Sequence, residues 1–185
     1  MKRKLLAGLL ALVLVPGMAR AATIGIGAYG GISSPLVQDD NGSGTLYGLR
    51  VPVNFVPLIS VEPYYAKTSG GSTDYTAAGV SYTRDGIDMD SYGANVLFMF
   101  GTGLQFYPFV GISSNHMKRP ALDSSETGYD FGLGLGFKLP LAGLSADIRA
   151  TGLAVTDPAN SQASRKWGEF TIGVAYSLFH FPAAP

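Results

Sequence analysis

Hydrophobic and polar residues alternate with a period of two through most of the chain after position 22. This period is typical of β-strands with one apolar and one polar face, because successive side chains of a strand point to opposite sides. Most of the alternating segments run for about 10–13 residues, roughly the length that a tilted membrane-spanning strand needs. The segments predicted as strands are Thr23–Ser33, Gly44–Asn54, Leu58–Lys67, Gly86–Phe100, Leu104–Met117, Glu126–Lys138, Leu144–Val155 and Lys166–Leu178.

The connections between these segments are sorted by length and polarity. The short, uncharged ones are Phe55–Leu58, Gly101–Gly103 and Leu139–Gly143. The long, polar and charged ones are about Ser34–Ser43, Thr68–Asp85, Lys118–Ser125 and Thr156–Arg165. Short turns at one end and long loops at the other are the arrangement of membrane barrels. The pattern therefore predicts an all-β fold, an eight-stranded antiparallel up-and-down transmembrane β-barrel.

The composition of the two faces indicates which one meets lipid. One face carries Ile, Val, Leu, Phe and Tyr, whereas the other carries Gly, Ser, Thr and too few charges for a soluble exterior. We therefore expect the apolar face to point outward and the polar face to line the lumen. The alternative is a soluble barrel with the apolar face inside, since alternation alone does not assign the faces. The residues expected to face lipid are Phe98, Phe131, Leu133, Ile148, Ile172 and Val174.

The N-terminus has the three parts of a secretory signal peptide. A basic start, Met1–Lys4, precedes the apolar run Leu5–Val15, and Ala19-Arg20-Ala21 has the small-x-small pattern of a cleavage site. An uncleaved anchor is the alternative, but the apolar run is much shorter than the roughly 20 residues of a membrane helix. We expect a signal peptide over residues 1–21, a barrel over 22–181 and a short tail over 182–185.

Composition and charge exclude several functions. The chain has no cysteine, which rules out disulfides, thiol chemistry and lipidation on cysteine. Without the signal peptide, 9 basic and 13 acidic residues remain, and this net negative charge argues against a nucleic-acid partner. The glycine-rich stretches Gly25–Gly27 and Gly132–Gly136 lie inside predicted strands with no helix following, so they are not phosphate-binding loops. We expect no cofactor and no metal site.

Several strands resemble those of the outer-membrane-protein β-barrel family, which includes small eight-stranded barrels related to the OmpA membrane domain and to OmpX/Ail. The stretches that carry the resemblance are Phe106-Tyr-Pro-Phe-Val-Gly-Ile, Tyr129-Asp-Phe-Gly-Leu-Gly-Leu-Gly-Phe, Leu144-Ser-Ala-Asp-Ile-Arg and Phe170-Thr-Ile-Gly-Val-Ala-Tyr-Ser-Leu-Phe. The resemblance covers essentially the whole mature chain and implies a location in the bacterial outer membrane. It also implies insertion by the barrel-assembly machinery. The chain departs from the family at its end, where Pro182–Pro185 follows the expected terminal aromatic.

A set of charged residues falls on the polar face of the predicted strands, where a barrel of eight strands is just wide enough for side chains to fill it. Buried charges must be paired, and the turn near residue 56 places Arg50 almost opposite Glu62. We interpret the set as a lumen charge network. A gated ion path through a rearranging Arg–Glu pair and a catalytic role for the carboxylates are the alternatives. Its members are Arg50, Glu62, Asp130, Lys138, Asp147, Arg149 and Glu169.

Two further groups lie near the expected outer rim. Ser114, His116 and Asp90 share the outward face and combine a nucleophile, a base and an acid, which acyl transfer would need. The signal for catalysis is weak, because outward polar residues at this height above the apolar band are typical of a solvated rim. The basic pairs Lys118-Arg119 and Arg165-Lys166 lie at the mouths of two long loops, at the expected level of lipopolysaccharide phosphates. Solvated loop bases without a ligand are the alternative.

These features support three function hypotheses. The first is a non-enzymatic outer-membrane barrel with a structural role in the envelope or a surface-interaction role through its loops, which are its variable, solvent-facing surface. Its partners are membrane lipid, lipopolysaccharide and an extracellular ligand at the loops. The second is an esterase of outer-leaflet lipid, of the lipid A deacylase type, and the third is a narrow gated pore. We expect the first, with no catalytic residue.

Overall fold

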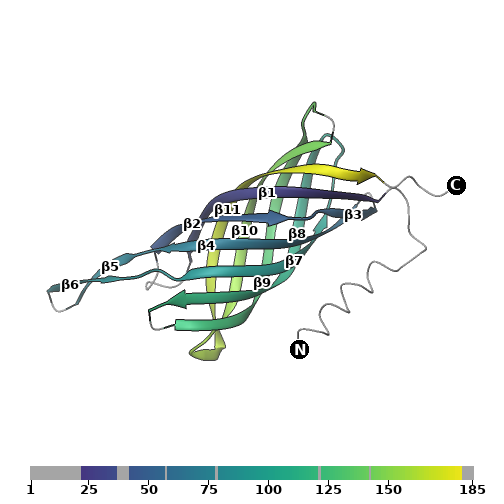
Figure 1. The fold of residues 1–185 in the computed structure, drawn as a ribbon. Coiled ribbons are helices and arrows are strands. Elements are labelled where there is room, and N and C mark those ends of the chain that lie inside the picture. The colour runs from purple at the N-terminus through teal and green to yellow at the C-terminus, as the bar shows by residue number, and fades with distance from the viewer. Residues whose placement is uncertain are drawn as a thin grey trace.

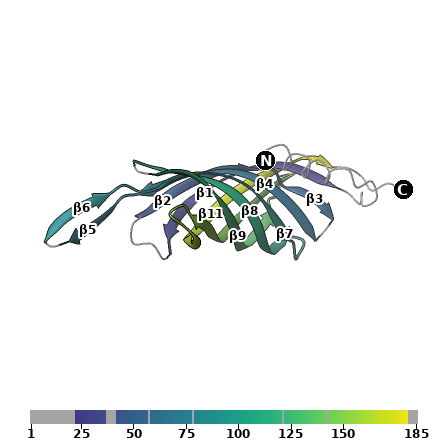
Figure 2. The ribbon, with the colours of Figure 1, turned by 90° about the horizontal axis from the view of Figure 1, so that it is seen from below.

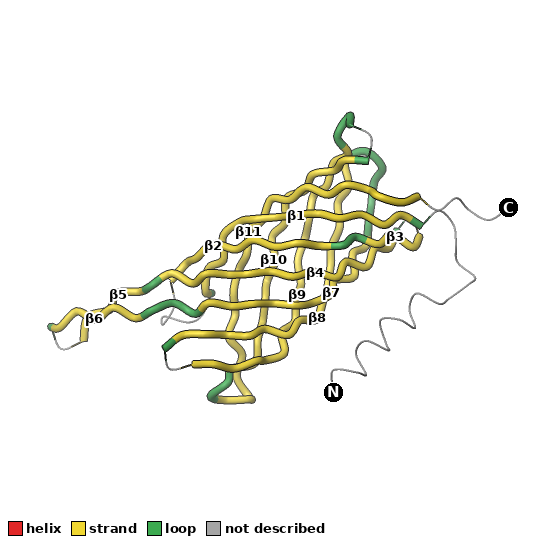
Figure 3. The backbone as a smooth tube through the Cα atoms, in the orientation of Figure 1, coloured by secondary structure: helices red, strands yellow, loops and turns green. Residues whose placement is uncertain are grey.

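The computed structural model describes residues 22–36, 42–56, 58–77, 79–120, 122–141 and 143–180. The predicted signal peptide over 1–21 and the predicted tail over 182–185 lie outside these residues. Strands make up nearly all of the described chain (Figure 3). A helix with the length and hydropathy of a membrane span does not occur in this part of the chain.

The strands form one closed antiparallel sheet and one small hairpin. They are β1 (Thr23–Pro35), β2 (Gly42–Arg50), β3 (Val53–Val56), β4 (Ile59–Gly71), β5 (Thr73–Ala77), β6 (Val80–Arg84), β7 (Asp88–Phe98), β8 (Leu104–Arg119), β9 (Leu122–Lys138), β10 (Leu144–Asp157) and β11 (Asn160–His180). The large sheet follows chain order, and β11 pairs with β1, which closes it into a ring (Figure 1). The predicted all-β barrel is confirmed.

β2 and β3 together form a single wall element of the barrel. Pro52, which has no N–H to donate, lies between them, and both strands pair with β1 on one side and β4 on the other. The backbone around the break stays hydrogen-bonded, because Gly25 N donates to Pro52 O at 2.9 Å and Val51 N donates to Pro63 O at 2.9 Å. With β2 and β3 counted as one, the nine strands of the large sheet form the eight barrel strands that were predicted.

The two ends of the barrel differ in their connections. Thr23, the first residue of β1, pairs with His180, the last of β11, so both lie at the same end. The short connections after β3, β7 and β9 also lie at this end. The long connection between β4 and β7 lies at the other end, where β5 and β6 form a separate two-stranded sheet that projects beyond the barrel (Figures 1 and 2). We call these the turn end and the loop end.

Side chains divide between the two faces as the alternation predicts. Phe131 and Ile172 are 59% and 60% exposed on the outer surface, and Phe98, Leu133 and Val174 are exposed with them. Ile148 lies on the same face but is half-buried between its cross-strand neighbours, Leu135 and Ile172. The inner face holds most of the buried polar and charged side chains. An apolar exterior around a polar interior is the arrangement of a barrel in lipid.

Three of the predicted long loops are instead mostly strand, and one of them, Thr68–Asp85, contains the end of β4 together with β5 and β6. β8 and β9 pair up to Arg119 and Leu122, so Lys118–Ser125 is a hairpin with a tight turn. β11 begins at Asn160, and most of Thr156–Arg165 belongs to the β10–β11 hairpin. The prediction was wrong here because it equated polarity with loop. Backbone pairing can continue beyond the bilayer, where outward side chains meet water and need not be apolar.

Candidate functional site: the interior of the barrel

A layer of four charged side chains crosses the lumen. Arg149 on β10 binds both carboxylate oxygens of Glu62 on β4, with Nη2 2.9 Å from Oε2. Arg50 on β2 donates from Nη2 to Oδ1 of Asp147 at 2.8 Å. Arg149 also contacts Asp147, with Nη2 3.0 Å from Oδ2. Each of these side chains is at most 11% exposed, and their charges balance within the layer.

The layer pairs its charges differently from the Arg50–Glu62 pair expected from the turn. The nearest atoms of that pair, Arg50 Nε and Glu62 Oε2, are 3.8 Å apart, too far for a hydrogen bond. Each arginine instead makes its shortest contact with a carboxylate that is distant in sequence, Arg149 with Glu62 and Arg50 with Asp147. The four residues lie together, but the strongest contacts join β2 to β10 and β10 to β4.

Aromatic rings support the layer. Tyr107 on β8 donates its hydroxyl to Asp147 Oδ2 and accepts a hydrogen bond from Arg149 Nε at 3.0 Å. The Arg149 guanidinium lies 5.3 Å from the centroid of the Tyr107 ring and 5.7 Å from that of Phe109, within the range of cation–π attraction. Arg50 is placed similarly over the ring of Tyr29, at 5.7 Å.

Glycine at cross-strand positions leaves room for these large groups, since Gly173 pairs with Asp147 and Gly134 pairs with Tyr107. A Cβ atom added at Gly173 would lie 2.5 Å from Arg50 Nη2 and 2.9 Å from Asp147 Oδ1. A Cβ added at Gly134 would collide with the ring of Tyr107. The glycine-rich polar face of the strands is therefore part of how the narrow lumen accommodates arginine and tyrosine side chains.

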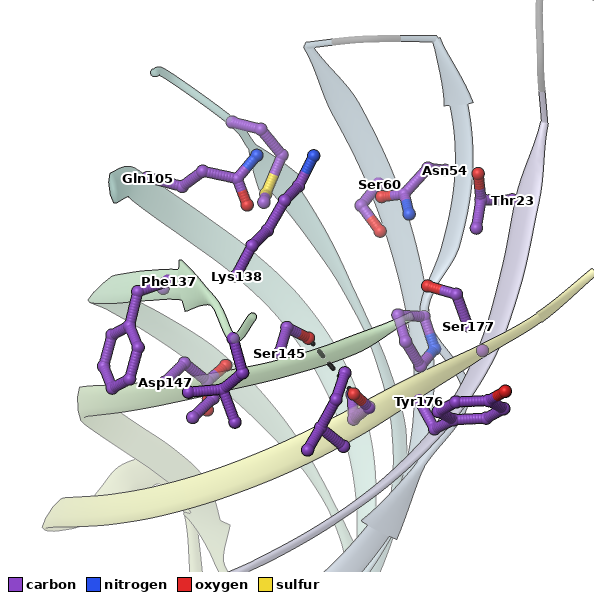
Figure 4. A pocket seen from close by; sticks show the side chains of 18 of the residues that line it. Thr23, Asn54, Ser60, Gln105, Phe137, Lys138, Ser145, Asp147, Tyr176 and Ser177 are labelled. Carbon is purple, nitrogen blue, oxygen red and sulfur yellow. Dashed lines mark hydrogen bonds between the residues drawn. The ribbon is translucent and has the colours of Figure 1, made fainter. Parts of the chain in front are cut away.

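The other members of the predicted network lie apart from the four-charge layer. Asp130 is buried and accepts a hydrogen bond from the Tyr64 hydroxyl at 2.8 Å. Glu169 is half-buried, with Ser33 Oγ 3.5 Å from its Oε1. Lys138 is exposed at the turn end, where it borders a recess (Figure 4). The structure thus brings together four of the seven predicted residues.

The recess opens at the turn end and has a volume of about 580 Å³. Hydroxyl and amide side chains line its wall, among them Asn54, Ser60, Ser145 and Ser177 (Figure 4). Its lining also includes all four members of the charged layer. Beyond the layer, a cavity of only about 40 Å³ continues toward the loop end.

A second barrier near the loop end is apolar, and it was not predicted from the sequence. Met89 pairs with Met117 across β7 and β8, and Leu153 pairs with Trp167 across β10 and β11. Each of these residues is at most 4% exposed. The buried cluster comprises Ile87, Met89, Met117, Leu153, Val155 and Trp167, and we call it the apolar plug. Large apolar residues on the polar parity of strands, just before their loop ends, are the sequence signal that could have revealed it.

The predicted rim constellation is only partly assembled. Asp90 and His116 are cross-strand neighbours, and Ser114 pairs with Tyr92. Asp90 instead contacts a residue outside the constellation, since its Oδ1 accepts a hydrogen bond from the Tyr65 hydroxyl at 3.1 Å.

The contacts of His116 lie on the other side, across the β8–β9 hairpin. Its Nδ1 lies 2.9 Å from Ser125 Oγ, and its Nε2 lies 3.3 Å from Asp123 Oδ1. The Asp123 side chain is 77% exposed. The serine and the acid that contact the His116 ring are therefore not the predicted Ser114 and Asp90.

The predicted basic pairs do not form one cluster. Lys118 and Lys166 are exposed, on β8 and β11, with two strands between them. Arg119 and Arg165 lie on the opposite parity and are half-buried. Arg165 Nε donates to Asp157 Oδ2 at 3.1 Å, within the β10–β11 hairpin. Two of the four cations are thus directed away from the surface where lipopolysaccharide phosphates would lie.

Comparison with known proteins agrees with this architecture, a membrane barrel with an apolar exterior and an interior closed by side chains. A family model described as the outer membrane protein beta-barrel domain matches residues 6–177. The chain belongs to this family and is a protein of the bacterial outer membrane. No curated protein sequence matches it.

Solved structures of outer-membrane proteins are similar to this chain at low sequence identity. Neisserial surface protein A is 16% identical with a TM-score of 0.56, over 85% of this chain and 99% of that one. A major outer membrane protein from Thermus thermophilus is 12% identical with a TM-score of 0.52, over 85% and 99%. The attachment invasion locus protein of Yersinia pestis, Ail, is 17% identical with a TM-score of 0.47, over 87% and 100%.

Proposed function

We propose that this protein is a non-enzymatic outer-membrane barrel with a closed lumen, serving the envelope structurally and through interactions at its loop end. The observation that carries the proposal is that two different barriers cross the interior, the four-charge layer and the apolar plug. A channel needs a continuous path. Here the recess on the turn-end side of the charged layer has a volume of about 580 Å³, whereas the cavity on the other side has only about 40 Å³.

Each barrier opposes ions for its own physical reason. An ion that enters the charged layer must displace buried arginine or carboxylate groups from their partners, which leaves an uncompensated buried charge. At the apolar plug, an ion would lose its hydration shell without gaining polar ligands. Two barriers in series make general diffusion through the barrel unfavourable.

The loop end supports the surface-interaction part of the proposal. The β5–β6 hairpin projects into solvent beyond the barrel, and the side chains of Val80 and Tyr82 are 52% and 47% exposed. Exposed, projecting loops on a rigid scaffold are where binding residues concentrate. We propose that this end faces outward and binds an extracellular ligand, and that Lys118 and Lys166 contact lipopolysaccharide. We also propose insertion by the barrel-assembly machinery, which membership of the family supports.

Planar-bilayer recording tests the closed lumen. The purified, folded wild-type protein should give no current or rare small openings. Large, stable, ohmic currents from the wild type would contradict the proposal and favour the pore. A general porin measured in the same membrane serves as the positive control.

Catalysis at the rim is the second candidate, favoured by the contacts of His116 with Ser125 and Asp123. A carboxylate as exposed as Asp123 is strongly screened by water, which makes it a weak orienting group. We expect no ester hydrolysis from lipopolysaccharide or a short-chain nitrophenyl ester. Turnover abolished by Ser125→Ala and retained by Ser114→Ala would contradict the non-enzymatic proposal.

A further inference from the structure

The cavity of about 40 Å³ lies between the charged layer and the apolar plug. Arg50, Glu62 and Arg149 of the layer line one part of it, and Leu153 of the plug lines another. Its remaining lining is rich in oxygen, with the carboxylates of Asp130 and Glu169, the amide of Asn95 and several hydroxyl groups. A liquid water molecule takes up about 30 Å³, so the cavity has the size for one or two small species.

The charges around this cavity do not balance. Arg50, Arg149, Glu62 and Asp147 neutralise one another within the layer. Among the contacts of the described residues, Asp130 receives hydrogen bonds from the hydroxyls of Tyr64 and Ser113, and Glu169 from that of Ser33. These donors are neutral. Two carboxylates in a confined interior therefore lack a compensating positive charge, which is energetically costly.

A second observation at the same cavity also points to a positively charged ligand. Asn95 is 7% exposed, and its carbonyl oxygen, Oδ1, has no hydrogen-bond donor in the described part of the chain. A buried acceptor without a partner carries a desolvation penalty of roughly 1–3 kcal/mol. The Asn95 amide and the two carboxylates line one cavity, and their oxygens are hard ligands of the kind that alkali and alkaline-earth cations prefer.

We propose that Asp130, Glu169 and Asn95 bind one monovalent cation of about the size of Na⁺ inside the barrel. Calcium would need 6–8 oxygen ligands with more negative charge, and the described residues contain no cluster of three or more acidic or histidine groups suited to a divalent ion. A monovalent cation offsets part of the excess negative charge and gives the Asn95 oxygen a partner. It thereby stabilises the interior between the two barriers.

The stability of the folded full-length barrel in different chloride salts tests the proposal. Unfolding in urea is followed in NaCl, KCl and N-methylglucamine chloride at equal ionic strength, so that general screening is the same. A cation present at about ten times its dissociation constant multiplies the folding equilibrium constant about 11-fold. We expect the wild type to be stabilised about this much by Na⁺ relative to the bulky organic cation.

Isosteric variants assign the effect to the site. Glu169→Gln and Asp130→Asn should lose the advantage of Na⁺, and Glu169→Gln should exceed the wild type in stability when only the organic cation is present, since it removes an unbalanced charge. A purely structural hydrogen-bonding role of Glu169 predicts the opposite change. Glu126→Gln is the matched control and should keep the full effect of Na⁺. Glu126 is a half-buried carboxylate on the same face of β9 as Asp130, but it does not line the cavity.

Three results would overturn the proposal. The first is equal wild-type stability in all three salts together with a strong pH dependence, which would mean that the carboxylates share a proton. The second is equal stability without pH dependence, which would mean that water alone solvates them. The third is a Na⁺ effect that persists in both site variants. If a variant fails to fold, the wild-type salt series alone still tests the proposal.

Discussion

Arg149 on β10 contacts both carboxylate oxygens of Glu62 on β4, across the lumen and across 87 positions of sequence. The two strands are not neighbours in the sheet, since β7, β8 and β9 lie between them on one side. The contact therefore ties opposite walls of the barrel through its centre. Because Arg149 also binds Asp147, and Asp147 binds Arg50, loss of one group affects the whole layer.

Removing Glu62 should destabilise the barrel strongly. Glu62→Ala leaves Arg149 buried without its main carboxylate, and breaking a buried pair in this way costs about 3–5 kcal/mol. Urea unfolding, read from the different gel migration of folded and boiled protein, measures the change. Asp85→Ala, at an exposed position between β6 and β7, is the control and should stay within about ±0.5 kcal/mol. Equal effects of the two substitutions would contradict a structural role for the layer.

The apolar plug should contribute stability of a different kind. Leu153→Ala removes buried methyl groups opposite Trp167 and should cost about 2–5 kcal/mol, from lost burial and the cavity that remains. The same urea assay applies. Val80→Ala, at an exposed position of the projecting hairpin, should change the free energy of unfolding by no more than about 0.5 kcal/mol. A small effect of Leu153→Ala would show that the cluster does not pack as described.

Opening both barriers should increase conductance more than opening either one. Glu62→Ala loosens the charged layer but leaves the apolar plug, and Leu153→Ser wets the plug but leaves the layer. In planar bilayers we expect rare openings from each single variant and frequent openings from the double variant. A single variant that conducts as well as the double one would show that only one barrier limits the current.

Protease added to intact cells should cut the connection between β4 and β7. We expect the loop end to face outward, and the exposed β6 segment Val80–Arg84 belongs to the hairpin that projects beyond the barrel. The β10–β11 hairpin should resist more, because its strands continue the large sheet of the barrel, whereas β5 and β6 pair only with each other. Disrupted cells provide the control for cleavage at the turn end. Cleavage of intact cells at the turn near residues 55–58 would reverse the orientation.

The sequence alone determined the class of fold and the direction of its faces. A two-residue period depends only on the alternation of side chains along a strand, so it can be recognised without knowing which strands pair. The lengths of the short turns likewise follow from local glycine and proline. For this reason we could predict the barrel, its eight strands and outward residues such as Phe131 and Leu133.

The partners inside the lumen were decided by the tertiary structure. Ring closure and stagger bring Arg149 to Glu62 and Arg50 to Asp147, and neither distance can be read from spacing within one hairpin. Parity directs Met117 and Trp167 inward, but only the same closure brings them together in a shared plug. Parity assigns a face to a residue, but only the shear of the closed sheet sets which residues meet at one height.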